Sequence, residues 1–346
     1  MGKPKVVYIL PFYDEGTDTH LFYNYLLIRQ LAERSDIDIS VVVERDQKFK
    51  WPPLRFLELI FLCFKLRVSG FSNFYVHYSY YGALAGWLVG GRTFYWNRGM
   101  PWLFKRGFFE EAVLKFILRH TILVTGPESL AKEYQSRYGV KEFRVLSNWV
   151  DIKRFIPTKP RSQIFQDKRI VLFVHHLSKR KGADLVPEIA KGFGENVEFL
   201  IIGEGPEREN LKLEIRNLPV RQAGWKLEKT VKLLGRVPNK EIIKYFHVSD
   251  VFIMPSREEG SPHVILEAMA SGTPFVASDI GGVRELVPKE LKGFLCEPED
   301  IKCFQERIKT LLSDKALYDK ARAIGLAHAK NFDIARGVKE FVNLFN

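Results

Sequence analysis

Two carboxylates, Glu259 and Glu267, lie in one short stretch with seven residues between them. The apolar run Val251–Met254 precedes them and predicts a buried strand that ends in a loop of small, polar and acidic residues. Residues that favour helix boundaries surround the second carboxylate: Ser261 as N-cap, Pro262 as first helical residue, Gly272 and Pro274 as the stop. A carboxylate and a helix N-terminus at the end of a strand are typical of ligand sites in open α/β sheets.

The spacing of these carboxylates argues against a glycoside hydrolase. Retaining hydrolysis needs two carboxyl groups about 5–5.5 Å apart across one bond. Glu259 is expected in the loop and Glu267 more than one turn into the helix, so separate contacts with one ligand fit better. The plainer alternatives are a solvated loop acid for Glu259 and a helix residue paired with a cation for Glu267.

A second strand end carries three consecutive cations, Lys179, Arg180 and Lys181, followed by Gly182. Their place after the apolar run Arg169–Val174 favours a phosphate contact, with a solvated loop as the alternative. The glycine frame of a P-loop is missing before the lysine. The adjacent histidines 175 and 176 would point to opposite faces of an extended chain, which disfavours a metal site.

The turn Gly203-Glu204-Gly205-Pro206 also joins a strand to a helix. A dinucleotide fingerprint would have a third glycine at Arg208 and an acid where the next strand ends in Leu234-Gly235. The turn is therefore predicted as a tight strand-to-helix connection. The Asp36-Ile37-Asp38 pair enters a strand, at the wrong end of a sheet to hold a diphosphate through a metal.

The length and composition of the chain predict two globular domains: it has 346 residues, of which 46% are hydrophobic and 27% charged. Three scattered cysteines, Cys63, Cys296 and Cys303, are interpreted as reduced thiols of a cytosolic protein. The run Val6–Leu10 is too short for a signal peptide, and we expect no membrane span because apolar runs of about 18 residues are missing.

The formal net charge of +12 calls for an anionic partner. Between Glu44 and Arg119, twelve basic residues face five acidic ones, so 12 − 5 = +7 of the excess lies in one segment. Large aromatic residues are interleaved with these charges, from Trp51 to Phe109. Cations beside large apolar side chains suit an anionic membrane surface. A solvated basic face and a nucleic-acid-binding surface are the alternatives.

Strands alternate with helices along the whole chain, which predicts parallel sheets. Predicted strands are 5–10, 38–43, 74–78, 93–96, 122–125, 169–174, 197–202, 231–234, 251–254, 275–277 and 293–295. Predicted helices include 20–34, 56–66 and 335–345. The Pro157–Pro160 linker suggests two doubly wound α/β domains, at 1–157 and 158–330, with the helix in 331–346 packing back on the first.

Several motifs in this order resemble the family 4 retaining glycosyltransferases, which have the two-domain GT-B fold with Rossmann-like domains facing a cleft. The main motif runs from Glu259-Gly260-Ser261-Pro262 to Glu267 and on to Pro274. Supporting matches are Lys181-Gly182, 203–206, 234–237, 278–282 and 148–151. The resemblance is strongest from Arg169 to Val287.

The resemblance implies that 1–157 is an N-terminal acceptor-binding domain and that 158–330 is a nucleotide-sugar-binding domain with the donor site. Lys181 would meet the diphosphate, and Glu267 would accept the ribose hydroxyls. Glu259 and the backbone from Gly260 to Val264 would hold the sugar and phosphates. The remaining implied donor contacts are Gly16, His176, Arg180, Gly203, Arg236, Val237, Ser261, Pro262 and His263. The chemistry implied is transfer with retention, without a divalent metal or another cofactor.

Three positions depart from the family pattern. His176 stands where the family has an arginine, and Arg180 or Lys179 would compensate. Asn97-Arg98-Gly99 stands where the family has a first-domain histidine. The predicted catalytic residues are therefore Glu259, Lys181 and Arg98. The double glycine of the first loop is reduced to Gly16.

The leading hypothesis is a cytoplasmic glycosyltransferase that moves a sugar from a UDP- or GDP-sugar to a glycan or lipid-linked acceptor, peripheral on the inner face of the cell membrane. A non-catalytic nucleotide-sugar-binding protein, a basic nucleic-acid-binding protein and a phosphorylase on the same fold are the alternatives. Donor turnover, salt-dependent nucleic-acid binding and dependence on orthophosphate separate them.

Overall fold

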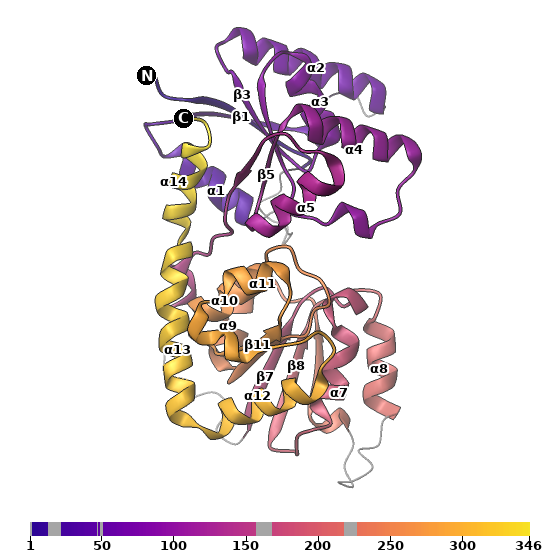
Figure 1. The fold of residues 1–346 in the computed structure, drawn as a ribbon, viewed down its shortest axis with the longest axis vertical. Helices are drawn as coiled ribbons and strands as arrows, with labels where there is room; N and C mark the ends of the chain where they lie inside the picture. Colours follow the sequence, from indigo (N-terminus) through magenta and orange to yellow (C-terminus); the bar gives the residue numbers. More distant parts are fainter. Residues whose placement is uncertain (1, 13–21, 47, 49–50, 157–167, 218–226) are drawn as a thin grey trace. The chain divides into compact units, whose positions relative to one another are not determined.

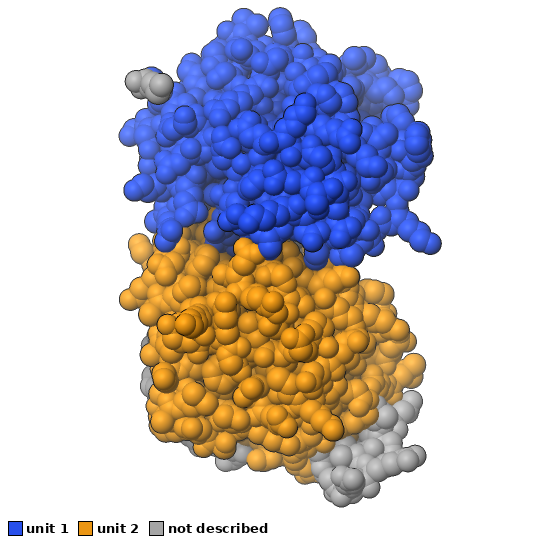
Figure 2. Space-filling view, in the orientation of Figure 1, with its two compact units in different colours: residues 1–148, 335–346 blue, residues 149–334 orange. Residues whose placement is uncertain are grey.

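A computed structural model describes residues 2–12, 22–46, 48, 51–156, 168–217 and 227–346. The chain divides into two compact units, Met1–Asn148 with Ala335–Asn346, and Trp149–Ile334 (Figure 2). The predicted linker at 157–160 lies outside the described residues, and the division in the structure falls after Asn148.

The first unit is built on a six-stranded parallel sheet in the order β2-β1-β3-β4-β5-β6. Its strands are β1 (Lys5–Leu10), β2 (Asp38–Val43), β3 (Asn73–His77), β4 (Arg92–Trp96), β5 (Ile122–Thr125) and β6 (Phe143–Val145). Val6 to Leu10 are fully buried, as expected for a central parallel strand covered on both faces. The order reverses between β1 and β3, which is the switch point of this sheet.

Helices cover the first sheet, with α2, α3 and α4 neighbouring one another (Figure 1). They are α1 (Phe22–Ala32), α2 (Pro52–Val68), α3 (Tyr80–Leu88), α4 (Phe108–His120) and α5 (Glu128–Tyr138). The prediction for α2 was too short at its start, because Pro52 and Pro53 form the first turn of the helix. Proline is tolerated there, since first-turn N–H groups have no partner within the helix.

The last helix, α14 (Ile334–Asn343), adds aromatic side chains to the core of the first unit (yellow in Figure 1). The Phe341 ring lies 4.7 Å from that of Tyr75 and 5.8 Å from that of Tyr8, measured between centroids. Phe345 contacts Phe94 at 4.9 Å. One aromatic cluster therefore joins the end of the chain to β1, β3 and β4.

The second unit has a six-stranded parallel sheet in the order β12-β11-β10-β7-β8-β9. Its strands are β7 (Arg169–Val174), β8 (Val197–Ile202), β9 (Val231–Gly235), β10 (Val251–Met254), β11 (Phe275–Ser278) and β12 (Leu295–Cys296). The predicted strand at 293–295 was wrong in its bounds, since Gly293 and Phe294 belong to the short 3₁₀ helix Lys289–Phe294. The register explains this, because only Leu295 and Cys296 pair with β11.

The helices of the second unit alternate with these strands. They are α6 (Ile152–Phe155), α7 (Val186–Ala190), α8 (Arg208–Asn217), α9 (Asn239–Val248), α10 (His263–Ala270), α11 (Gly281–Leu286), α12 (Ile301–Ser313) and α13 (Lys315–Ala329). The sheet order reverses between β7 and β10, so the switch point of this unit lies between those strands.

The prediction of three reduced cysteines was wrong. Cys296, at the end of β12, and Cys303, in the first turn of α12, form a disulfide, and their Cα atoms are 5.8 Å apart. The four-residue turn between strand and helix brings them together, with Glu299 in the left-handed region at φ 68°. Cys63 is a free, buried thiol.

Among the described helices, we find none that combines the length and the apolar character needed to cross a bilayer.

Candidate functional site

Two loops meet at the switch point of the second unit. The loop after β7 carries residues 175–182, and the loop after β10 carries residues 255–262. Both leave the carboxyl edge of the sheet, because all strand pairs of this sheet are parallel. This edge, at the reversal of strand order, is where open α/β sheets bind ligands.

The Glu259 carboxylate is the centre of a buried polar cluster between these loops. Oε2 lies 2.6 Å from the Lys181 ammonium. Oε1 accepts hydrogen bonds from Ser256 Oγ at 2.9 Å and from His175 Nε2 at 2.8 Å. The Glu259 residue is only 8% exposed. The alternative of a solvated loop acid is therefore excluded, and the two predicted residues Glu259 and Lys181 are in direct contact.

The tautomer of His175 follows from its two contacts. The backbone N–H of His176 donates to His175 Nδ1 at 2.9 Å, so Nδ1 carries no proton. Nε2 then holds the proton and donates it to Glu259. Burial lowers the pKa of His175, against the opposing effect of Glu259. His175 is thus a neutral donor that orients the carboxylate.

The protonation states of the ion pair follow from burial and proximity. Burial alone would raise the pKa of Glu259, but the electrostatic effects and hydrogen bonds of His175 and Lys181 outweigh burial and lower the pKa to about 2. Burial lowers the pKa of Lys181, and the carboxylate opposes that effect. The carboxylate is therefore ionised at neutral pH, and a lysine is held beside it at the sheet edge.

Close backbone contacts hold the loops of this site together. Gly182 has φ +69°, and a Cβ there would lie 1.9 Å from the Pro255 carbonyl oxygen. A Cβ on Gly282, in the first turn of α11, would lie 1.6 Å from the Gly260 oxygen. Only glycine allows such an approach. The loops after β7, β10 and β11 therefore touch through their main chains.

Arg257 fastens the two loops to each other. Its guanidinium forms a bidentate pair with Asp184 at 2.8 and 2.9 Å and contacts Glu299 at 2.6 Å. Its backbone N–H donates to the Arg180 carbonyl at 2.9 Å. Sequence reasoning missed Arg257 and His175 as parts of the site, because their partners Asp184 and Glu259 are 73 and 84 residues away in the sequence. It also missed Ser256, whose partner Glu259 lies three residues further on in the same loop.

The helix after the β10 loop begins one residue later than predicted. Its N-cap is Pro262, with ψ 121°, and the first helical residue is His263, so the prediction of Ser261 as N-cap was wrong. The extended backbone at Pro262 keeps it outside the helix. The N-terminus of α10, with its positive dipole end, still follows directly on the Glu259 loop.

The other predicted donor contacts in this unit differ in exposure. Glu267 and Pro262 are buried, and Glu267 lies in the interior of α10. His176 and Arg236 are exposed, and the half-buried ones are Arg180, Gly203, Val237, Gly260, Ser261, His263 and Val264. Main-chain hydrogen bonds hold the neighbouring strand ends together, since the His175 N–H donates to the Ile202 carbonyl and the Gly203 N–H to the Gly235 carbonyl.

The two predictions in the first unit have different outcomes. Gly16 lies outside the described residues. Arg98 is buried, donates from a guanidinium nitrogen to the Leu146 carbonyl and lies 5.0 Å from the Trp96 ring centroid. Burial lowers the pKa of Arg98 to about 10. It remains a cation at neutral pH, held by β4 and the segment after β6.

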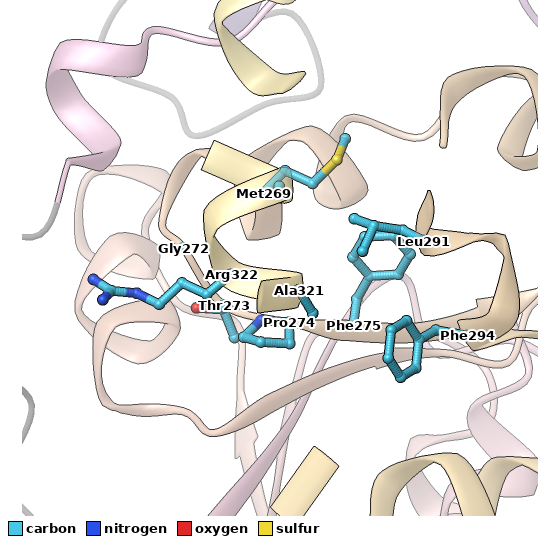
Figure 3. Close-up of a pocket in the computed structure, with 10 residues that line it drawn as sticks. Met269, Gly272, Thr273, Pro274, Phe275, Leu291, Phe294, Ala321 and Arg322 are labelled. Carbon is cyan, nitrogen blue, oxygen red and sulfur yellow. The ribbon is translucent and has the colours of Figure 1, made fainter. Parts of the chain in front are cut away.

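A small hollow lies at the other end of α10, between that helix and α13 (Figure 3). Its wall is mostly apolar, with Met269, Phe275, Leu291 and Phe294, and Arg322 lies beside it. None of the predicted site residues lines it. The hollow is separate from the Glu259 cluster. Among the described residues, no group of three or more His, Cys, Asp or Glu side chains is arranged to hold a metal.

The fold and the family of this chain can be compared with those of known proteins. Two doubly wound units are shared with the HepE protein of Anabaena, whose crystal structure in complex with UDP and glucose matches at a TM-score of 0.78, covering 99% of each chain at 18% identity. That likeness confirms the predicted fold class, the GT-B type. Residues 156–327 match the model of the glycosyl transferases group 1 family. The chain thus carries a domain that belongs to this family.

Two curated relatives agree with this assignment. The UDP-Gal:alpha-D-GlcNAc-diphosphoundecaprenol alpha-1,3-galactosyltransferase of Escherichia coli is 30% identical over 213 residues, 58% of this chain and 53% of the relative. The GDP-mannose-dependent monoacylated alpha-(1-6)-phosphatidylinositol monomannoside mannosyltransferase of Corynebacterium glutamicum is 27% identical over 241 residues, 64% of this chain and 53% of the relative. The chain spans about half the length of these relatives.

Proposed function

We propose that this protein is a retaining glycosyltransferase that moves a sugar from a UDP- or GDP-sugar to a glycan or lipid-linked acceptor. The observation that carries the proposal is the contact between Lys181 and Glu259 at the switch point of the second unit. This contact lies inside the segment that matches the family. The names of the two relatives supply the donor and acceptor classes, UDP-galactose or GDP-mannose and lipid-linked acceptors.

Charge stabilisation is the proposed work of the β7 loop. Breaking the bond between sugar and diphosphate leaves negative charge on the leaving group. Lys181, with Arg180 beside it and the N-terminus of α10 opposite, would receive this charge. The proposal therefore needs no divalent metal and no other cofactor.

Positioning of the sugar end is the proposed work of the β10 loop. Glu259 is ionised and held by three donors, so a sugar hydroxyl would meet a fixed acceptor rather than a mobile one. Gly260 to Val264 would contribute backbone groups, and Glu267 the contact with the ribose. Gly203, Arg236, Val237 and His176 complete the proposed donor contacts. Arg98 would act from the first unit.

A panel of UDP-, GDP- and ADP-sugars tests donor binding by thermal stabilisation. A ligand at about 100 times its Kd stabilises the folded state by about 2.7 kcal/mol, which a thermal shift detects. We expect one donor to give a larger thermal shift than the others. Arg236→Ala should reduce that shift, and Lys320→Ala, at an exposed lysine on α13, should leave the shift unchanged. No stabilisation by any donor would refute the proposal.

Turnover tests the chemistry once the donor is known. Lys181→Ala and Glu259→Ala should lower turnover at saturating donor by about 100-fold or more, as loss of a group that stabilises transition-state charge does. Turnover should persist in EDTA. Product with inverted anomeric configuration would refute retention, and binding without turnover of any acceptor would favour the non-catalytic alternative.

A further inference from the structure

Large apolar side chains are exposed mainly in the first unit. Of the nineteen that are exposed in the described part of the chain, sixteen belong to this unit. Fourteen of these lie between Trp51 and Phe109. The exposure is therefore a local property of α2, α3 and the start of α4, since isolated apolar residues scattered over a surface would be normal.

One side of α2 forms a continuous apolar stripe. Its exposed members recur every three or four residues and so share a face: Trp51, Leu54, Leu57, Phe61, Phe64 and Val68. Phe61 is 70% and Val68 72% exposed, while Leu59 and Cys63 on the other side are buried in the core. Lys65 is the one exposed charged residue of this helix. A soluble helix normally shows the reverse pattern, with its apolar side inward and its polar side in water.

The helices packed next to α2 also expose large apolar side chains. α3 packs against both α2 and α4, and the Phe56 and Tyr81 rings are 5.5 Å apart (Figure 1). At the start of α4, Phe108 is 93% and Phe109 80% exposed, and Phe104 precedes them at 54%. We refer to the exposed apolar residues of α2, α3 and 103–109 as the apolar face.

The charge of this region has one sign. The sequence contains no Asp or Glu between Glu58 and Glu110, but it contains Lys65, Arg67, Arg92, Arg98, Lys105 and Arg106. The acids that bound this interval are engaged: Glu58 accepts from the Lys48 N–H, and Glu110 and Glu111 contact Arg106 or Lys115. The exposed Lys65 and Lys105 are not in an ion pair with any described residue. The apolar face is therefore edged by excess positive charge.

We propose that the apolar face docks on the surface of an anionic lipid bilayer, with α2 lying along the interface. A bilayer interface offers both an apolar layer for Phe61 and Phe108 and anionic headgroups for Lys65 and Lys105. A second copy of the same face would bring like charges together. A nucleic acid would engage the cations but leave aliphatic side chains such as Leu57 and Val68 in water.

One end of the apolar face lies at the carboxyl edge of the first sheet. Helices that follow parallel strands begin at the carboxyl edge of the sheet, so the N-terminal residues of α2, α3 and α4 lie at that edge. Ligands of open α/β sheets bind there. A docked face would present the headgroup of a lipid-linked acceptor to this edge. This last step rests on the proposed function, and the docking itself does not.

Vesicle co-sedimentation tests the docking directly. The probes are phosphatidylcholine vesicles with and without one third phosphatidylglycerol, at low and at high salt. We expect binding to the anionic vesicles at low salt, weakened in high salt because the headgroup attraction is screened. Phe61→Ser/Phe64→Ser should lower the partition coefficient about tenfold or more on both kinds of vesicle. Lys65→Glu/Lys105→Glu should lower it only on the anionic ones.

Matched controls lie in the second unit. Leu213 on α8 is exposed like the residues of the stripe, and Lys320 on α13 is an exposed lysine, so Leu213→Ser and Lys320→Glu should leave partition unchanged. Circular dichroism and the thermal shift with the donor verify the fold of each variant. That shift is measured without vesicles, so a failure of donor binding and a failure of docking are separate results.

Three outcomes would overturn the inference. The first is that the wild type does not bind anionic vesicles, or binds them no better than Phe61→Ser/Phe64→Ser does. The second is a dimer in light scattering that Phe61→Ser/Phe64→Ser dissociates, which would assign the face to a second copy. The third is binding to duplex DNA at physiological salt that the lysine variants abolish and the phenylalanine variants leave intact.

Discussion

The Lys181 ammonium lies 2.6 Å from Oε2 of Glu259, and the two side chains are only 8% and 5% exposed. They come from different loops, after β7 and β10, on the two sides of the point where the strand order reverses. Their contact thus links the architecture of the second sheet to the proposed chemistry. It also makes the stability of this unit depend on residues that we propose for catalysis.

A double-mutant cycle measures this dependence. Lys181→Met leaves a buried carboxylate without its cation, and Glu259→Gln leaves a buried ammonium without its anion. Each should lower the free energy of unfolding by about 3–5 kcal/mol. The double variant should lose less than the sum of the two, which chemical denaturation would show.

The exposed pair Lys315–Asp319 is the matched control for that cycle, with side chains 86% and 55% exposed. Its coupling energy should be close to zero, because water screens exposed ion pairs. Additive losses at Lys181 and Glu259 would show that the buried contact does not stabilise the fold.

The low pKa of Glu259 predicts acid sensitivity. The pKa is about 2 in the folded state and 4.5 in the reference state, so between these values the unfolded chain binds a proton that the folded chain does not. The stabilisation is present above pH 4.5 and is lost as the pH falls toward 2, by about 3 kcal/mol in total. Denaturation curves across this window should show a shallower dependence on pH for Glu259→Gln. An unchanged slope would contradict the assigned pKa.

His175 should matter for the direction of the Glu259 carboxylate. His175→Gln places an amide N–H near the former Nε2 and keeps the donor to Glu259, whereas His175→Asn keeps an acceptor near Nδ1 and loses that donor. We expect the glutamine variant to retain more turnover than the asparagine variant, with equal affinity for the nucleotide-sugar. The opposite ranking would mean that the contact with the His176 N–H is the important one.

Adjacent glycines test the main-chain contact between the loops. Gly282→Ala would place a Cβ 1.6 Å from the Gly260 oxygen, while a Cβ at Gly281 meets nothing within 4 Å. Gly282→Ala should lower the free energy of unfolding by about 2 kcal/mol or more and weaken donor binding, because the loop must move. Gly281→Ala should do neither, and equal effects of the two changes would refute the contact.

The Cys296–Cys303 disulfide predicts a redox effect on stability. It closes a short loop, for which loop entropy gives about 2 kcal/mol. Thermal unfolding with and without reductant should differ for the wild type, and Cys296→Ser/Cys303→Ser should not respond to reductant. Because Glu299 lies in this loop and pairs with Arg257, reduction should also weaken donor binding. A wild type indifferent to reductant would show that these cysteines do not form the bond in solution.

Strands were predicted well where burial alone defines them. β1, β5, β7, β8 and β10 have the predicted bounds, because central parallel strands are continuous apolar runs. β2 also has the predicted bounds, although it is an edge strand and mostly half-buried. The bounds of β12 were not predicted correctly, because a strand of two residues is defined only by its pairing with β11. Glu259 and Lys181 could be predicted as site residues because ligands bind at the carboxyl ends of parallel strands.

The contacts within the site could not be predicted. His175 and Glu259 are 84 residues apart, and Arg257 and Asp184 are 73 apart. No local pattern of residue types encodes such pairs, since they follow from how two loops fold over one sheet edge. The disulfide was missed for a similar reason, because the left-handed turn at Glu299 that brings its cysteines together is unusual for a glutamate.

The aromatic cluster of the first unit has a consequence for the order of events during synthesis. Tyr8 and Tyr75 are made early, but Phe341 and Phe345, which pack against them, are made almost 270 residues after Tyr75. The ribosome therefore synthesises the second unit before it adds the last side chains of the first core. The unit that is begun first is the one that is completed last, and until then its nascent sheet must wait with an uncovered aromatic surface.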